Sequence, residues 1–187
     1  MAGARLFYDL GSPYAWLTAE RLAEADADVA WVPVLLGGIF AATGRSSWAR
    51  TDAREEGIGE IERRAAARGL APLVWPDPWP NDGLLAMRAA TAAHAEGDGA
   101  GRAFALAAFR LHFTEGRPLS DPDAVREAAV RAGLDPEPLL TPSQATKDAL
   151  RAATDQALAL GVFGIPTLVT AAGDVLWGDD RIPDAPA

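Results

Sequence analysis

Strand-like segments occur only near the two ends of this 187-residue chain, and a long helical block separates them. Residues 5–9 predict a short strand, and a helical pattern follows. Residues 28–36 are rich in Val, Leu and Trp and predict a second strand, which Gly37 and Gly38 close. This strand-helix-strand order is typical of parallel pairing through a right-handed crossover. Residues 166–178 then predict a β-hairpin. Any fold for this chain must accommodate β-α-β, a helical block and β-β, in that order.

The middle of the chain, residues 45–160, is rich in alanine and has the periodicity of helices. A loop with four prolines, residues 72–83, interrupts it, because proline breaks regular elements. Cap and stop signals predict five helices in this block: 52–69, 82–96, 101–115, 121–133 and 143–160.

Composition and charge exclude several classes of function. A net charge of −9 argues against nucleic acid as a partner, since binding a phosphate backbone needs clustered Lys and Arg. The chain has no cysteine, which excludes disulfides, thiolate metal sites and an internal dithiol redox cycle. With only His94 and His112, we expect no His-rich metal site, although carboxylate sites stay open. Without an apolar run of membrane-spanning length or a recognisable signal peptide, we expect a cytoplasmic protein that makes no membrane contact.

The turn in "LGSPYAWLTAERL", residues 10–22, is the first candidate site. Ser12 suits an N-cap, and Pro13 suits the first helical position. One interpretation is a cap that only starts a helix. The other is an anion site, because the positive end of a helix stabilises a negative group such as a ligand's thiolate.

Two further candidates lie near the C-terminal hairpin. In "GVFGIPT", a cis peptide bond before Pro166 would expose the backbone of Ile165 to an extended ligand, whereas a trans bond would make this segment a stiff connector. In "WGDDR", Asp179 and Asp180 either form a solvated strand end or receive a ligand ammonium group.

Three segments together carry a resemblance to a known family: "FYDLGSPYAWLTAERL", "PVLLGGIFAATGR" and "GVFGIPTLVTAAGDVLWGDDR". They resemble the 2-hydroxychromene-2-carboxylate isomerase and kappa-class glutathione transferase branch of the DsbA-like thioredoxin superfamily. The resemblance implies an α/β protein with a thioredoxin fold, β-α-β … β-β, and a large all-helical insertion. Residues 1–44 and 161–187 would form the discontinuous thioredoxin-like domain, and residues 45–160 the insertion.

The resemblance also implies a function. The protein would be an isomerase or transferase that uses glutathione or another small thiol, without a metal, on a small conjugated or electrophilic substrate. Ser12 would be the catalytic residue that hydrogen-bonds the thiolate. Ile165 and Pro166 would bind the peptide backbone of the cofactor, and Asp179 and Asp180 its γ-glutamyl end. The alternative is a non-catalytic thioredoxin-fold protein that binds peptides or thiols.

Two departures from the family pattern change what is expected at the substrate site. Ala41 and Arg45 stand where family members often have Lys and Asn. Either a substrate carboxylate would then need Arg45, Arg50 or Arg54, or the substrate is different. We expect Arg45 and Trp48 to contact the substrate. The Pro-rich loop could add Trp75 and Trp79 to the cleft. The family's final helix is shortened or absent, so that either the insertion or a second subunit of a homodimer would cover one sheet face.

Overall fold

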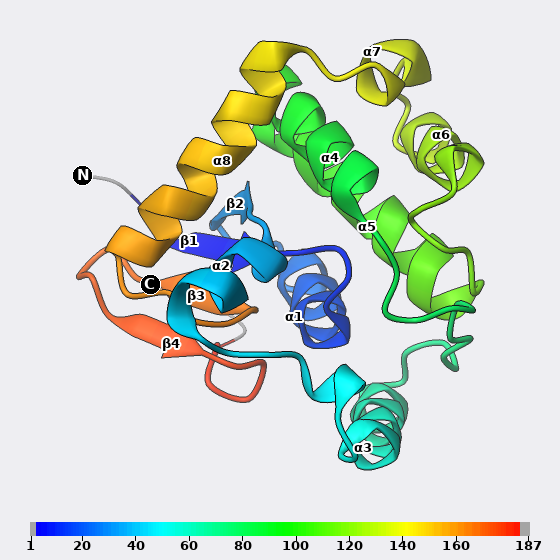
Figure 1. Cartoon of the computed structure of the whole chain (residues 1–187), viewed down its shortest axis with the longest axis vertical. Helices are drawn as coiled ribbons and strands as arrows, with labels where there is room; N and C mark the ends of the chain where they lie inside the picture. The colour runs from blue at the N-terminus through cyan, green and yellow to red at the C-terminus, as the bar shows by residue number, and fades with distance from the viewer. Residues whose placement is uncertain (1–2, 184–187) are drawn as a thin grey trace.

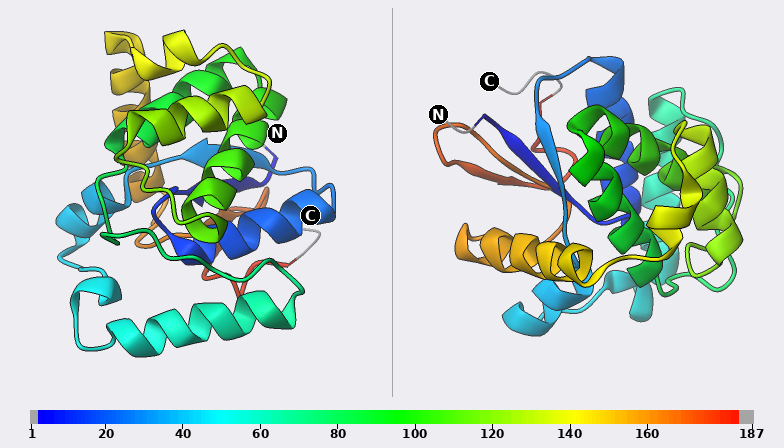
Figure 2. Two further views of the ribbon diagram at one scale, coloured as in Figure 1. Left: turned by 90° about the vertical axis from the view of Figure 1, so that its right-hand side faces the viewer. Right: turned by 90° about the horizontal axis from the view of Figure 1, so that it is seen from above.

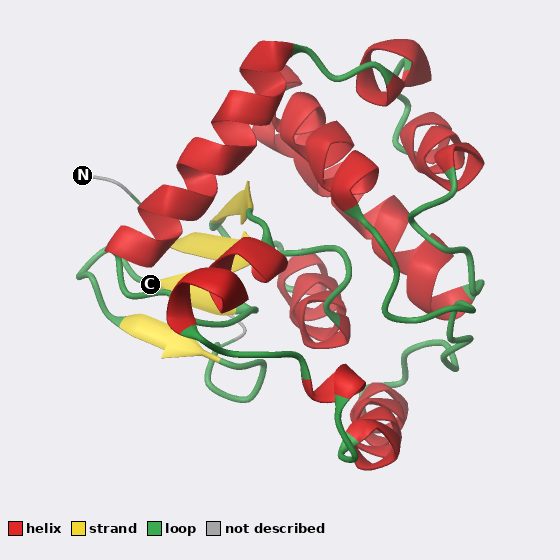
Figure 3. Cartoon of the chain, in the orientation of Figure 1, coloured by secondary structure: helices red, strands yellow, loops and turns green. Residues whose placement is uncertain are grey.

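A single four-stranded sheet unites strands from the two ends of the chain (Figure 1). In the computed structural model, which describes residues 3–183, the strand order is β2-β1-β3-β4. β1 (Arg5–Tyr8) pairs in parallel with β2 (Ala30–Pro33). On its other side β1 pairs antiparallel with β3 (Thr167–Val169), which in turn pairs antiparallel with β4 (Val175–Trp177). The predicted β-α-β and β-β order is confirmed, and the remaining elements are helices (Figure 3).

The pairing of β1 with β3 brings two distant segments of the chain together. In this register Leu6 lies opposite Leu168 and Phe7 opposite Thr167, and all four side chains are buried. Because the two strands are antiparallel, the end of β1 lies beside the start of β3. The turn after β1 and the loop before β3 therefore meet at one edge of the sheet, although about 150 residues separate them along the chain.

Helices cover both faces of the sheet (Figure 2). α1 (Pro13–Glu24) follows β1 and buries Trp16, Leu17 and Leu22, whereas α8 (Gln144–Ala159) lies on the other face and contacts β2. The other helices are α2 (Leu36–Thr43), α3 (Arg54–Ala67), α4 (Leu84–Glu96), α5 (Asp98–Thr114), α6 (Pro122–Arg131) and α7 (Pro136–Leu140), with a short 3₁₀ helix η1 (Trp48–Arg50). The five predicted helices are confirmed within three residues at each end; α7 and η1 were not expected.

The expected strand over residues 28–36 is too long, and the interpretation of its end is wrong. β2 ends at Pro33, and the glycines expected to close the strand, Gly37 and Gly38, lie inside α2. The Asp9 carboxylate accepts a hydrogen bond from Leu36 N, the first amide of α2, at 2.8 Å. A negative group at this position satisfies an amide that the helix itself leaves unpaired, which helps a helix to begin where glycines would disfavour it.

The predicted division at residues 44/45 and 160/161 stays a prediction. α8 lies inside the proposed insertion, yet Leu35 N donates a hydrogen bond to Thr154 Oγ1 at 3.0 Å, so that α8 is fixed to the segment after β2. Within the described part of the chain no helix follows β4; residues 179–181 form a turn, and Ile182 is buried in the core. The last four residues of the proposed thioredoxin-like domain, 184–187, lie outside the described residues. Among residues 3–183, no helix combines the length and apolar character that crossing a membrane requires.

A buried histidine in α5 makes stability depend on pH. His112 is 1% exposed, its Nδ1 lies 2.9 Å from the carbonyl oxygen of Arg117, and burial lowers its pKa from 6.5 to about 4. Below pH 6.5 the unfolded chain takes up a proton that the folded protein excludes. We expect the free energy of unfolding to fall as pH drops from 6.5 towards 4, by up to roughly 3 kcal/mol. Urea unfolding, measured at several pH values across this range, gives the free energy of unfolding as a function of pH. This free energy will fall less steeply with decreasing pH in His112→Asn than in the wild type, and an equally steep fall would contradict the prediction.

Candidate functional site

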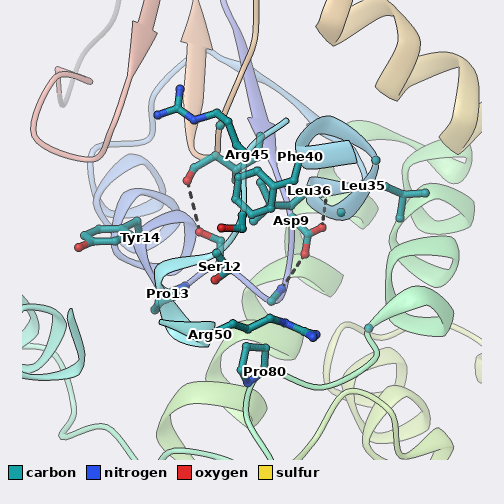
Figure 4. Close-up of a pocket in the computed structure, with 18 of the residues that line it drawn as sticks. Asp9, Ser12, Pro13, Tyr14, Leu35, Leu36, Phe40, Arg45, Arg50 and Pro80 are labelled. Atoms are coloured by element: carbon teal, nitrogen blue, oxygen red, sulfur yellow. Dashed lines mark hydrogen bonds between the residues drawn. The ribbon is translucent and has the colours of Figure 1, made fainter. Parts of the chain in front are cut away.

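A cavity of about 740 Å³ opens at the sheet edge where the end of β1 meets the start of β3 (Figure 4). Its walls come from residues 9–14, from α2, from residues 45–50, from the Pro-rich loop at 79–84 and from residues 163–165. Five segments that are distant in the sequence thus surround one space large enough for a small-molecule ligand. This is the candidate site.

Ser12 lies in the wall of the cavity at the positive end of α1. It is the N-cap of α1, its Oγ accepts a hydrogen bond from Ala15 N at 3.3 Å, and Pro13 occupies the first turn, as predicted. The Ser12 hydroxyl also donates to the carbonyl oxygen of Ile165 at 3.5 Å, which is a long contact. Because this contact is long, the hydroxyl can turn towards an anion in the cavity at little cost.

The loop before β3 brings the second predicted element to the same place. The Ile165–Pro166 peptide bond is cis, which confirms that alternative. Gly164 and Ile165 line the cavity, whereas Pro166 is buried behind them and its carbonyl oxygen accepts a hydrogen bond from Gly178 N at 3.0 Å. The structure thus brings Ser12 and Ile165 together. That Ile165 and Pro166 bind a ligand backbone stays a prediction.

Asp179 lies outside the cavity wall, and its expected role of receiving a ligand ammonium group stays a prediction. It is 1% exposed and does not line the cavity. Arg68 donates to both of its oxygens, at 2.7 and 3.0 Å, and Arg64, Arg21 and Thr18 contact the same carboxylate at 3.3, 3.5 and 3.1 Å. Burial alone would raise the pKa of Asp179, but the bonds and charges of Arg68 and Arg21 outweigh it, so this pKa lies below its ordinary value. Side chains of α1 and of the C-terminal end of α3 thus hold the Asp179 carboxylate.

Asp180 is exposed and also lies outside the cavity wall. Its side chain is turned back towards Gly178, where an added Cβ would come within 2.8 Å of Asp180 Oδ1. Neither acid of the "WGDDR" segment therefore faces the cavity in this structure, and a ligand role for Asp180 stays a prediction.

The predicted substrate residues do line the cavity. Arg45 is exposed at the rim, and its guanidinium lies 4.9 Å from the ring centre of Phe163 and 5.2 Å from that of Trp177. Arg50 also lines the cavity and extends across it in Figure 4. Arg54 does not; its guanidinium binds Glu55 and the carbonyl oxygen of Trp79.

Aromatic side chains form one wall of the cavity. Trp48 lies 5.5 Å from Trp79 and 6.2 Å from Tyr14, measured between ring centres, and all three line the space. Trp75 stands behind them, 4.6 Å from Trp79, and does not reach the cavity. The Tyr14 hydroxyl donates to Glu60 of α3 at 2.8 Å. Flat apolar surfaces of this kind suit a planar or conjugated ligand.

Asp9 is a charged lining residue that sequence reasoning missed. Its Oδ1 accepts a hydrogen bond from Gly11 N, and its Oδ2 accepts one from Leu36 N, both at 2.8 Å (Figure 4). Burial raises the pKa of the Asp9 carboxyl, although the two amide bonds act in the opposite direction. The available signal was its position, because an acid directly after a buried strand lies at the edge where ligands gather.

The family follows from a comparison over nearly the whole chain. Residues 5–185 match the model of the DSBA-like thioredoxin domain. The chain belongs to this family. A search of curated proteins finds no match.

Solved structures share the fold of this DSBA-like chain. A 2-hydroxychromene-2-carboxylate isomerase aligns with a TM-score of 0.82 and 21% identity, over 96% of this chain and 90% of the isomerase. A probable DsbA oxidoreductase from Streptomyces coelicolor aligns at 0.70 and 21% identity, over 97% and 84% of the two chains. The cytosolic disulfide reductase DsbM from Pseudomonas aeruginosa aligns at 0.63 and 16% identity, over 93% and 87%. These likenesses establish the fold, and the resemblance found in the sequence is confirmed at that level.

Proposed function

We propose that the protein is a thiol-dependent isomerase or transferase of the 2-hydroxychromene-2-carboxylate isomerase type. The observation that carries this proposal is the meeting of Ser12 and Ile165 in one wall of a cavity that contains no cysteine. An anion site at the start of a helix, without a thiol of its own, suits a sulfur supplied by a small molecule. The fold shared with an isomerase of this type supports the proposal.

The residues present fit the thiol end of such a cofactor. Ser12 and the α1 N-terminus would hold a thiolate, and Ile165 would bind the adjoining backbone, with Pro166 fixing its position. The oxygens of Asp179 accept hydrogen bonds from Arg68, so the amino end of glutathione would need another partner. For this reason the proposal includes other low-molecular-weight thiols beside glutathione. When bound, the thiol supplies a nucleophile that adds reversibly to a conjugated double bond, which allows rotation before elimination.

The other walls of the cavity account for the substrate. Trp48, Trp79 and Tyr14 offer flat surfaces against which a conjugated system packs, and Arg45 and Arg50 offer positive charge for an anionic group on it. Holding the substrate between these walls and Ser12 would orient its double bond towards the sulfur. The substrate is then a small, electrophilic, conjugated molecule, and a negative charge on it would strengthen binding.

Location and assembly follow the same reasoning. We propose the cytoplasm, because a reduced thiol cofactor persists in reducing compartments. The DsbM neighbour is described as cytosolic, which agrees with this placement. A homodimer stays part of the proposal, with the exposed Trp177 and Val175 of the edge strand β4 as the surface to examine.

Thermal unfolding with added thiols tests the proposed function. We expect millimolar glutathione to raise the melting temperature, because a ligand that binds only the folded state stabilises it by RT ln(1 + [L]/Kd). S-methylglutathione is the matched ligand, since it keeps the peptide but cannot form a thiolate. A clearly smaller shift with S-methylglutathione supports a thiolate site.

Other results of the same measurement point elsewhere. Equal shifts with both peptides, together with no turnover of thiol-plus-electrophile pairs, would favour a non-catalytic binding protein. The loss of the family Lys at Ala41 and the occupied Asp179 are the observations on that side. No shift with any low-molecular-weight thiol would refute the proposed function.

A further inference from the structure

The Asp9 carboxylate is a charged group in the cavity wall that the proposed function has not yet used. It directly follows β1, and Ser12 N donates a hydrogen bond to its backbone carbonyl oxygen at 3.0 Å. Its two side-chain oxygens are held by the amides of Gly11 and Leu36. Asp9 is therefore fixed within the same turn as Ser12, and both face the same space.

Within residues 3–183, no arginine, lysine or histidine forms an ion pair with Asp9, and its described partners are the two amides. Carboxylates removed from water are normally paired with a cation, so an unpaired one in a cavity is a candidate for function. The α4 side of the turn contributes a sulfur, since Leu10 N lies 3.2 Å from Met87 Sδ. Tyr8, the last residue of β1, precedes Asp9 and is the nearest titratable group along the chain. The other charged or titratable groups around the cavity are Tyr14, Arg45, Arg50 and Asp82.

Two anions in this space would oppose each other. A thiolate held at Ser12 and an ionised Asp9 would lie in the same cavity wall, because the two residues belong to one turn, and that wall is partly shielded from water. Like charges at such a site cannot both ionise freely, so one proton is shared between them. Burial already raises the pKa of Asp9, which helps this carboxylate to hold that proton.

We propose that Asp9 is the proton acceptor for the thiol that binds at Ser12. The inference rests on the proposed function. As the thiol S–H bond breaks, its electron pair stays on sulfur and an O–H bond forms on Asp9, so that the cavity keeps one negative charge. When the thiol is released, the O–H bond breaks and the proton returns to sulfur. No proton is exchanged with solvent in either direction, and no other reactant is needed.

Counting protons on binding tests the assignment directly. Calorimetric titration with glutathione, in buffers of different ionisation enthalpy, gives the number of protons released per thiol bound. We expect close to zero at neutral pH for the wild type, because Asp9 keeps the proton. Asp9→Asn cannot accept it, so this variant will release close to one proton per thiol. Its bound thiol will also ionise at lower pH in ultraviolet titration, since a nearby negative charge is gone.

Turnover is the weaker measurement here, because the variant still forms thiolate. Asp9→Asn should hold at least as much thiolate as the wild type, so the proton count and the pKa of the bound thiol, and not a loss of turnover, report the proposed role. A purely structural role predicts only lower stability, because Asp9 also supports the start of α2. Asp135→Asn is the matched control: Asp135 caps α7 by accepting from Glu137 N at 3.1 Å, far along the chain from the cavity.

The outcomes separate the two proposals. If the wild type binds glutathione and releases about one proton, Asp9 is not the acceptor, although the thiol site stands. The same conclusion follows if Asp9→Asn matches Asp135→Asn in the proton count and in the pKa of the bound thiol. If the wild type binds no thiol, both proposals fall. In the wild type, an ultraviolet thiolate signal with no proton released already requires an acceptor in the protein, so the test holds even if Asp9→Asn does not fold.

Discussion

Alanine at position 12 will lower turnover at neutral pH by about 10- to 100-fold and leave the fold intact. A hydrogen bond to a charged group contributes about 1.5–3 kcal/mol, and the Ser12 hydroxyl is the side-chain donor that the structure places at the positive end of α1. Without it, the pKa of a bound thiol rises and less thiolate is present. Ultraviolet titration of the bound thiol will detect the higher pKa, and steady-state kinetics the slower turnover.

The matched control for this change is Ser143→Ala. Ser143 is the N-cap of α8, and its Oγ accepts from Thr146 N at 3.1 Å, as Ser12 Oγ does from Ala15 N. Each variant should lose about 1 kcal/mol of stability, the usual cost of removing a cap. Only Ser12→Ala should change the thiol pKa and turnover. If the two variants behave alike, Ser12 is merely a cap.

The meeting of Ser12 and Ile165 was predictable from the sequence because two short motifs determine it. Each motif joins a strand to a tight local structure, and the pairing of β1 with β3 then aligns their ends. The helical block was predictable for a similar reason: proline, glycine and acidic caps mark its boundaries locally. Sequence signals that depend only on neighbouring residues, and that occur in an order known from a family, therefore predict the fold well.

The sequence could not show contacts that depend on packing between distant segments. Asp179 looked like a solvated strand end because its partners, Arg64 and Arg68, lie more than 100 residues away and resemble an exposed helix face. α2 was missed because its first amide is satisfied by Asp9, from a different element. Local propensity favours a turn at Gly37 and Gly38, and the tertiary contact reverses that preference.

Replacing Asp179 with asparagine will lower the free energy of unfolding by about 3 kcal/mol, the usual result of breaking a buried ion pair by removing one partner. The Asp179 side chain is fully buried, and the loss would leave three arginine side chains short of their acceptor. α3 depends on this contact: the helix lies apart from the sheet at the bottom of Figure 1, and the elements that it packs on most are α1 and η1. Hydrogen exchange should therefore rise first in α3, and the melting temperature should fall by roughly 10 °C.

Acid should erase the difference between Asp179→Asn and the wild type. The pKa of Asp179 is depressed in the folded protein, so its contribution is complete above the ordinary value of 3.8 and is lost as pH falls further. Unfolding measured at neutral pH and in acid will show this convergence.

Asp180→Asn separates the structural role of the "WGDDR" segment from the ligand role that the family resemblance implies. Asp180 is exposed, so its replacement should change stability by less than about 0.5 kcal/mol. If Asp179 serves the fold, Asp179→Asn destabilises the protein and weakens glutathione binding no more than its unfolding explains. If instead Asp179→Asn keeps the wild-type melting temperature and raises the Kd for glutathione, the arginines must release the carboxylate to the ligand. The buried, four-partner geometry of Asp179 favours the first result, because freeing it would expose three cations to gain one ammonium group.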